Sequence, residues 1–256
     1  MRITLIDYTR NAKEILILSK NTRHLSGDTR FDDIIKMDND TKNSELEYVF
    51  GTISSAWEFV DYTFLIQDVS RAYTHQQVRH RVMSFSQQSL RVFPAESFSY
   101  YIPPNIEKDR FQLAVYEAAM KNIQNNYNVL LHKGADIQDA RGILPTNICT
   151  HILVKANLRA LSNLMETRLC VRAQGEFQDA ALTMKELVKE VHPWAEHVLN
   201  PCCILHGYCQ FKNFECPLKV KYKHLQPVSD ETKKALSDDW GALMEHGYSP
   251  QPKQQI

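Results

Sequence analysis

Apolar and polar residues follow two different periods along this chain. Residues 2–9 and 59–66 form short runs with β-branched and aromatic residues, which predicts two strands. Residues 83–92 have no helical period and predict an extended or looped segment. The first part of the chain should therefore supply a sheet.

Helical periodicity is clearest between residues 107 and 133, where apolar residues recur every three or four positions. Gly134 follows this stretch and is a typical residue for the end of a helix, because glycine adopts positive φ without strain. Further helices are predicted over residues 11–20, 46–54, 69–78, 148–168 and 176–191, and residues 38–43 are predicted to form a loop.

Together these elements predict an α+β fold. No internal repeat or low-complexity segment is found in residues 1–220, so we expect a single domain there. Residues 221–256 are polar, contain prolines and several lysines, and predict a C-terminal tail.

Composition and charge exclude several classes of protein. The chain has 256 residues, of which 43% are hydrophobic, and 30 basic side chains balance 30 acidic ones. Such a balance argues against a general nucleic-acid-binding surface. No apolar run approaches the roughly 18 residues of a membrane span, and the N-terminus lacks the apolar core of a signal peptide. We therefore expect a cytoplasmic protein with reduced cysteines and neither nucleic acid nor membrane as a partner.

One stretch departs from this balance. Between Arg71 and Arg91 lie four arginines and two histidines, without a single Asp or Glu. A guanidinium presents a planar fork of donors that matches a phosphate or carboxylate edge. The serines and glutamines at positions 84–89 add neutral donors and acceptors that can read the edge of a base. A solvated basic face would have the same composition.

The order of residues favours the binding site. Arg79-His80-Arg81, seven residues and then Ser89 resemble the R-H-R-x7-S signature of the flavin-dependent thymidylate synthases. The resemblance includes "DVSRAYTHQQVRHR" (68–81), "ARGILPTNI" (140–148), "NLRALSNLMETRLC" (157–170) and "RAQGE" (172–176). These blocks cover most of residues 55–180 in the expected order.

The resemblance implies both an activity and an assembly. Members of this family make thymidylate from deoxyuridylate (dUMP), with methylenetetrahydrofolate as carbon donor and NADPH as reductant through bound FAD. They are homotetramers whose active sites are shared between subunits. Their fold is a single α+β domain with a central, mostly antiparallel sheet and several helices.

The resemblance also assigns residues to two binding sites. Positions matching the dUMP contacts are Gln76, Arg79, Gln87, Gln88, Ser89, Arg91, Arg141 and Arg168. Positions matching FAD contacts are Ser55, Arg79, His80, Arg81, Gln87, Asn157, Arg159 and Asn163. Arg168 is the implied catalytic residue, because negative charge that develops on the uracil ring needs a fixed cation and a guanidinium stays charged.

Three positions depart from the family pattern. Ile53 occupies a place that commonly holds a histidine, Val92 replaces a tyrosine, and Gly175 replaces an aromatic residue. These changes motivate two alternatives. One is a related flavin-dependent modification at C5 of a pyrimidine nucleotide, such as hydroxymethylation. The other is a catalytically silent homologue that binds the nucleotide.

A cysteine cluster lies beyond these blocks, in "PCCILHGYCQFKNFECP" (201–217). The spacings of Cys202, Cys203, Cys209 and Cys216 lack the paired C-x2-C knuckles of a zinc ribbon. A structural zinc site in this cluster, which also contains His206, is the alternative; we expect buried free thiols there and predict no metal ligands.

Overall fold

The computed structural model describes residues 1–24, 30–92, 94–211, 216–218 and 230–245. The chain divides into two compact units. Unit 1 consists of residues 1–4 and 64–154, and unit 2 of residues 5–63 and 155–256.

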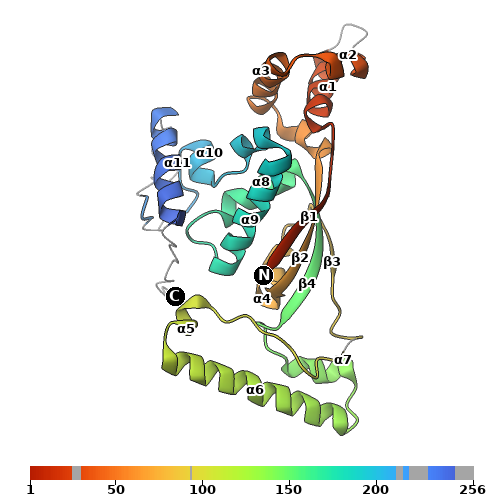
Figure 1. Cartoon of the computed structure of the whole chain (residues 1–256), viewed down its shortest axis with the longest axis vertical. Helices are drawn as coiled ribbons and strands as arrows, with labels where there is room; N and C mark the ends of the chain where they lie inside the picture. Colours follow the sequence, from red (N-terminus) through yellow and green to blue (C-terminus); the bar gives the residue numbers. More distant parts are fainter. Residues whose placement is uncertain (25–29, 93, 212–215, 219–229, 246–256) are drawn as a thin grey trace. The chain divides into compact units, whose positions relative to one another are not determined.

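Four strands form one antiparallel sheet in the order β1-β2-β4-β3 (Figure 1). The strands are β1 (Arg2–Tyr8), β2 (Asp61–Ser70), β3 (Ser84–Gln87) and β4 (Cys149–Asn157). This sheet confirms the predicted α+β class, and the two predicted strands correspond to β1 and β2.

Strand β4 corrects the prediction of a helix over residues 148–168. Its side chains alternate between buried and exposed positions, with Thr150, Ile152, Val154 and Ala156 buried. This period of two is that of a strand with one face on the core. The helix begins only after β4, at Leu158.

Strand β2 contains Asp68, the one non-glycine residue with positive φ (57°) among those described. Up to Ile66 every second residue of β2 is buried, but beyond Asp68 the consecutive residues Val69 and Ser70 are both buried. An extra residue inside a strand shifts the alternation in this way.

Unit 1 contains a long helix and several short ones. They are α4 (Arg71–Gln77), α5 (Pro104–Glu107), α6 (Arg110–His132), α7 (Ile137–Ala140) and the 3-10 turn η2 (Arg141–Ile143). The predicted long helix is α6 (Figure 1). Asp109 caps it by accepting two backbone N–H groups, and Gly134 follows it with φ of 87°, as predicted.

Helix α6 is only partly buried within unit 1. Tyr127 is fully buried, and its hydroxyl accepts the backbone N–H of Ala95 at 3.1 Å. The side-chain amide of Gln124 also holds the segment around Ala95 against α6, because its Nε2 donates to the Ala95 carbonyl at 2.9 Å. In contrast, Phe111 and Val115 are 79% and 55% exposed.

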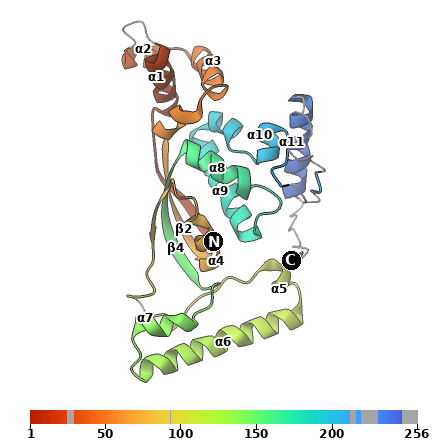
Figure 2. The same cartoon turned by 180° about the vertical axis from the view of Figure 1, so that it is seen from behind.

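Unit 2 is mainly helical. Its elements are α1 (Ala12–His24), α2 (Phe31–Lys36), α3 (Asn39–Phe50), η1 (Ser54–Phe59), α8 (Leu158–Arg168), α9 (Gly175–Val191), η3 (Pro193–Val198), α10 (Cys202–His206) and α11 (Asp230–Glu245). Helices α8 to α11 lie side by side in both views (Figures 1 and 2). None of the described helices is long and apolar enough to cross a membrane.

Two predicted elements of unit 2 differ from the structure. The predicted loop over residues 38–43 is the start of α3, which Asp38 caps by accepting the N–H of Thr41 at 2.8 Å. Helix α11 lies within the predicted tail, and its Leu236 and Trp240, four residues apart, are both buried. Residues 221–229 and 246–256 of that tail lie outside the described residues.

Candidate functional site

The predicted site residues fall into two groups. Unit 1 holds Gln76, Arg79, His80, Arg81, Gln87, Gln88, Ser89, Arg91 and Arg141, and unit 2 holds Ser55, Asn157, Arg159, Asn163 and Arg168.

Helix α4 positions the R-H-R tripeptide of unit 1. Ser70 caps the helix, because its Oγ accepts a backbone N–H of the first turn at 2.9 Å. At the other end Arg79 N donates to the Gln76 carbonyl at 3.2 Å. Arg79 and Arg81 are exposed and His80 is half-buried. The tripeptide therefore follows the helix directly, as the sequence predicts.

Hydrogen bonds hold Gln87 and Gln88 in place at the end of strand β3. Gln87 Nε2 donates to Thr74 Oγ1 at 2.8 Å, which ties β3 to α4. The backbone N–H of Gln88 donates to the His151 carbonyl at 3.1 Å and so continues the pairing with β4. The Gln88 carbonyl accepts a hydrogen bond of 2.6 Å from Arg71 Nη2.

An open hollow of about 540 Å³ lies beside this strand. Its lining consists of Ser89, Arg91, Val92, Asp136, Ile137 and Gln138. Arg141 is adjacent, because its Nε donates to the carbonyl of Gln138 at 3.1 Å. The structure therefore brings together three predicted nucleotide contacts, Ser89, Arg91 and Arg141.

Arg71 joins this group and was not among the predicted contacts. Its Nε is buried and has no hydrogen-bond partner among the described residues. Burial, and then the nearby charge of Arg141, lower the pKa of Arg71. The sequence offered one signal for it, since Arg71 opens the stretch without acidic residues that ends at Arg91. We call Arg71, Arg91 and Arg141 the arginine group.

The arginine group has no acidic partner in the part of the chain that the structure describes: none of the ion pairs found there involves it. Asp136 contributes a carboxylate to the lining of the hollow. Three guanidinium groups against one carboxylate leave a net positive charge. A bidentate anion such as a phosphate matches this set of donors.

In unit 2 the predicted cofactor contacts gather where η1 meets the start of α8. Asn157 is the N-cap of α8, since its Oδ1 accepts a backbone N–H of the first turn at 2.8 Å. Arg159 Nη1 pairs with Glu58 Oε1 at 2.6 Å, and Glu58 lies in η1 with the exposed Ser55. Asn163 is exposed one turn further along α8 than Arg159.

Arg168 is the last residue of α8 and is half-buried. The centre of its guanidinium lies 4.4 Å from the centroid of the Phe177 ring. A cation over an aromatic face is attracted by the ring, and a cation at a helix C-terminus is stabilised by the helix dipole. Both effects favour a fixed position of the Arg168 guanidinium at the end of α8.

Comparison with known proteins gives the family. Residues 4–194 match the family described as thymidylate synthase complementing protein. A flavin-dependent thymidylate synthase of Sulfurisphaera tokodaii is 36% identical over 210 residues, which cover 80% of this chain and 80% of that protein. The enzyme of the same name from Pyrococcus furiosus is 32% identical over 243 residues, or 90% of this chain and 98% of that protein.

A third relative comes from a bacterium, Nitratidesulfovibrio vulgaris. It bears the same name and is 38% identical over 172 residues, which cover 64% of this chain and 70% of that protein. The family match covers the arginine group, the R-H-R tripeptide (Arg79-His80-Arg81) and α8. The chain belongs to the family of flavin-dependent thymidylate synthases.

Proposed function

We propose that the protein converts dUMP to thymidylate by reductive methylation at C5, with methylenetetrahydrofolate as the carbon donor and NADPH as the source of electrons. Relatives that this chain covers over most of their length are named flavin-dependent thymidylate synthases. The observation that carries the proposal is the arginine group beside Ser89, which has no acidic partner among the described residues.

The arginine group is the proposed site of the dUMP phosphate. Arg91 and Ser89 line the hollow, Arg141 is adjacent to it, and the unpartnered buried Nε of Arg71 is a donor in need of an acceptor. A buried donor without a partner costs free energy, which a bound anion would recover. The amides of Gln76, Gln87 and Gln88 are the proposed contacts to the nucleoside.

FAD is the proposed cofactor, and the residues present fit it. Arg79 and Arg81 are exposed guanidinium groups suited to a diphosphate. Arg159 pairs with Glu58 through Nη1, and no hydrogen-bond partner for the other N–H groups of this guanidinium is found among the described residues. Ser55, His80, Asn157 and Asn163 complete the proposed set. When bound, the flavin supplies the hydride chemistry, while the protein binds and orients the reactants.

Arg168 is the proposed catalytic residue. Nucleophilic attack by C5 requires electron density on the uracil ring, and a fixed cation stabilises the negative charge that develops there. The guanidinium accomplishes this without taking up or releasing a proton. Its place over Phe177 keeps it oriented before the nucleotide binds.

The proposed assembly is a homotetramer with shared active sites. Helix α6 supports it, because Phe111, Val115 and Val129 are 79%, 55% and 56% exposed in the single chain. Large apolar side chains gathered on one helix favour association with another surface.

The test is mass spectrometry of the nucleotide after incubation with dUMP, methylenetetrahydrofolate, FAD and NADPH at low oxygen. Methylated product is expected. A hydroxymethylated product would place the chain with the related C5-modifying enzymes. Unchanged dUMP together with tight dUMP binding would identify a silent nucleotide-binding homologue.

A further inference from the structure

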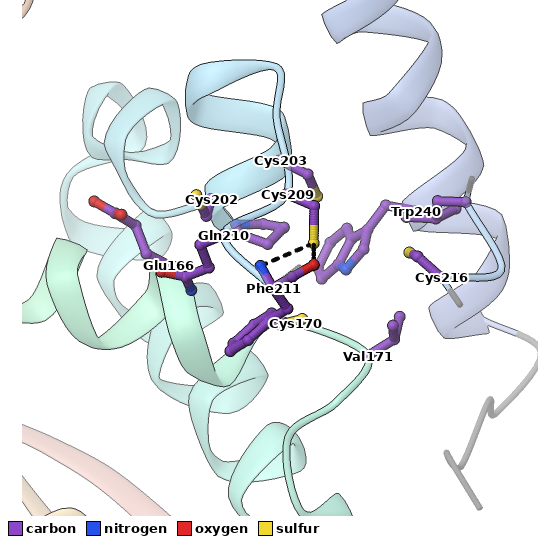
Figure 3. Close-up of a pocket in the computed structure, with 12 residues that line it drawn as sticks. Glu166, Cys170, Val171, Cys202, Cys203, Cys209, Gln210, Phe211, Cys216 and Trp240 are labelled. Atoms are coloured by element: carbon purple, nitrogen blue, oxygen red, sulfur yellow. Dashed lines mark hydrogen bonds between the residues drawn. The ribbon is translucent and has the colours of Figure 1, made fainter. Parts of the chain in front are cut away.

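Five of the chain's six cysteines line one cavity in unit 2. They are Cys170, Cys202, Cys203, Cys209 and Cys216 (Figure 3). Cys149, the sixth, lies in β4. Cys170 follows α8, Cys203 lies in α10, and Cys209 and Cys216 follow α10. Segments distant in sequence thus bring their thiols to one place.

The cavity is small and mostly apolar. The space in it is about 20 Å³, close to that of a single water molecule or ion. Val171, Phe211 and Trp240 are part of its wall (Figure 3). An organic ligand does not fit this volume, whereas a metal ion does.

Two of the thiols have amide donors of the kind found around metal-bound sulfur. The backbone N–H of Phe211 donates to Cys209 Sγ at 3.4 Å, and the Cys209 thiol donates to the Phe211 carbonyl at 3.6 Å, as the two dashed lines in Figure 3 show. Burial raises the pKa of the Cys170 thiol, and a backbone hydrogen bond from Arg172 partly opposes this shift. In each case the donor lies two residues after the cysteine. Such outer contacts orient a ligand and stabilise its thiolate form.

We propose that Cys170, Cys203, Cys209 and Cys216 bind one zinc ion through four thiolates. Four sulfur ligands and no open position are typical of a structural zinc site. The guanidinium of Arg172, which lies 4.4 Å from the centroid of the Phe211 ring in the cavity wall, offsets part of the negative charge of such a site. This proposal goes beyond the proposed function and does not depend on it.

Glu166, Cys202 and His206 form a rival set. Their ligand atoms lie within 4.8 Å of one another, and among the described residues no other such group of three is found. The four proposed thiols would therefore have to draw together around the ion. The rival set offers only three ligands, however, and its imidazole and carboxylate already pair at 3.4 Å. The side chain of His206 is also 41% exposed. A soft, closed, four-sulfur set suits zinc better.

The zinc would hold α8 to the C-terminal helices. Trp240 of α11 is part of the cavity wall, and its Nε1 donates to the carbonyl of Leu169 at 3.1 Å. Leu169 and Cys170 directly follow Arg168 at the end of α8. A metal at this point would stabilise the turn that carries Arg168.

The first test is the metal content of the full-length protein, purified without chelators and measured by mass spectrometry. About one zinc per chain is expected for a single site. Cys209→Ser and Cys216→Ser should each lose most of it. Cys202→Ser, in the same cavity, and Cys149→Ser, outside it, are matched controls that should retain it. Zinc lost in Cys202→Ser but kept in Cys209→Ser would overturn the proposal in favour of the rival set.

A second test needs no variant. The protein produced with cobalt in place of zinc should show strong ligand-field absorption in the red, where flavin does not absorb, with the intensity of a four-sulfur tetrahedral site. A weak spectrum typical of oxygen and nitrogen ligands would overturn the proposal, as would iron in place of zinc. Absence of any metal, with all six thiols free to react after unfolding, would also overturn it.

Discussion

The guanidinium of Arg71 lies within electrostatic range of that of Arg141, and neither forms an ion pair with a carboxylate among the described residues. We therefore expect Arg71→Gln to weaken dUMP binding about 10- to 100-fold, the usual effect of losing a hydrogen bond to a charged group. Calorimetric titration with dUMP and with deoxyuridine measures this. Only dUMP binding should weaken, because deoxyuridine has no phosphate. Arg10→Gln, at an exposed arginine of unit 2, is the control. Equal losses for both ligands would contradict a phosphate contact.

Arg168→Gln should reduce turnover by about 100- to 1,000-fold while dUMP affinity changes only a few-fold, because the charge acts mainly in the transition state. Single-turnover kinetics and equilibrium binding separate the two effects. Phe177→Leu retains the guanidinium but removes the ring beneath it, so its turnover should be intermediate. Full turnover in Arg168→Gln would remove this residue from the proposed mechanism.

His192 should make folding stability depend on pH. It is buried and hydrogen-bonded to Tyr62 at 2.9 Å, and burial lowers its pKa from 6.5 to about 4. Between these values the unfolded chain binds a proton that the folded chain does not, so stability falls as the pH falls from 6.5 towards 4. The full contribution, present above pH 6.5, is at most about 3 kcal/mol.

Urea unfolding at a series of pH values measures this contribution in the wild type and in His192→Phe. The variant should lose that part of the acid sensitivity. His197→Phe is the control, because that histidine lies on the same segment and is exposed. Identical pH profiles for wild type and His192→Phe would contradict the assignment.

Ile53→His restores the residue that the family commonly has at this position. Ile53 is 66% exposed, so the fold should tolerate the change. We expect the variant to retain more flavin per chain after purification, because an imidazole adds a hydrogen-bonding group near the proposed cofactor contact Ser55. Flavin absorbance relative to protein measures this, with Ile53→Ala as the control. Equal flavin in all three proteins would show that the departure at this position is neutral.

Charge on the exposed apolar side of α6 should disrupt the proposed tetramer. Phe111→Glu combined with Val115→Glu should shift the protein to a smaller species in light scattering, since burying two carboxylates in an interface is costly. The far-UV spectrum should stay unchanged, because both side chains are exposed in the single chain. Lys121→Glu, an exposed polar position of α6, is the control. A tetramer that survives the double change would exclude this surface.

Local patterns predicted much of the fold. The period of α6, its end at Gly134, strand β1 and the place of the R-H-R turn all follow from neighbouring residues. Strand β4 was missed because its alternation is blurred in the sequence. Polar Thr150 is buried whereas apolar Leu153 is 38% exposed, so hydrophobicity does not report which face each residue takes.

The candidate sites were also only partly predictable from local sequence patterns. Residues of the signature could be placed by their order, yet Arg71 could not be assigned, because its closeness to Arg141 depends on how strands β2 and β4 pair. Likewise Cys170 lies far in sequence from the other cysteines of the cavity. The spacing of cysteines along the chain therefore does not predict that the fold brings Cys170 close to them.

The extra residue at Asp68 sets the register in which β2 pairs with β4. Hydrogen bonds just beyond both ends of β2 link it to the residues that flank β4. At one end the carbonyl of Val60 accepts the N–H of Leu158, and at the other the N–H of Arg71 donates to the carbonyl of Ile148. The eleven steps from Val60 to Arg71 thus match the ten from Ile148 to Leu158, and Asp68 takes up the difference. Deleting one residue here would shift Arg71 out of register with β4 without changing any arginine. Alignments of related enzymes should therefore count residues at this point before comparing their identities.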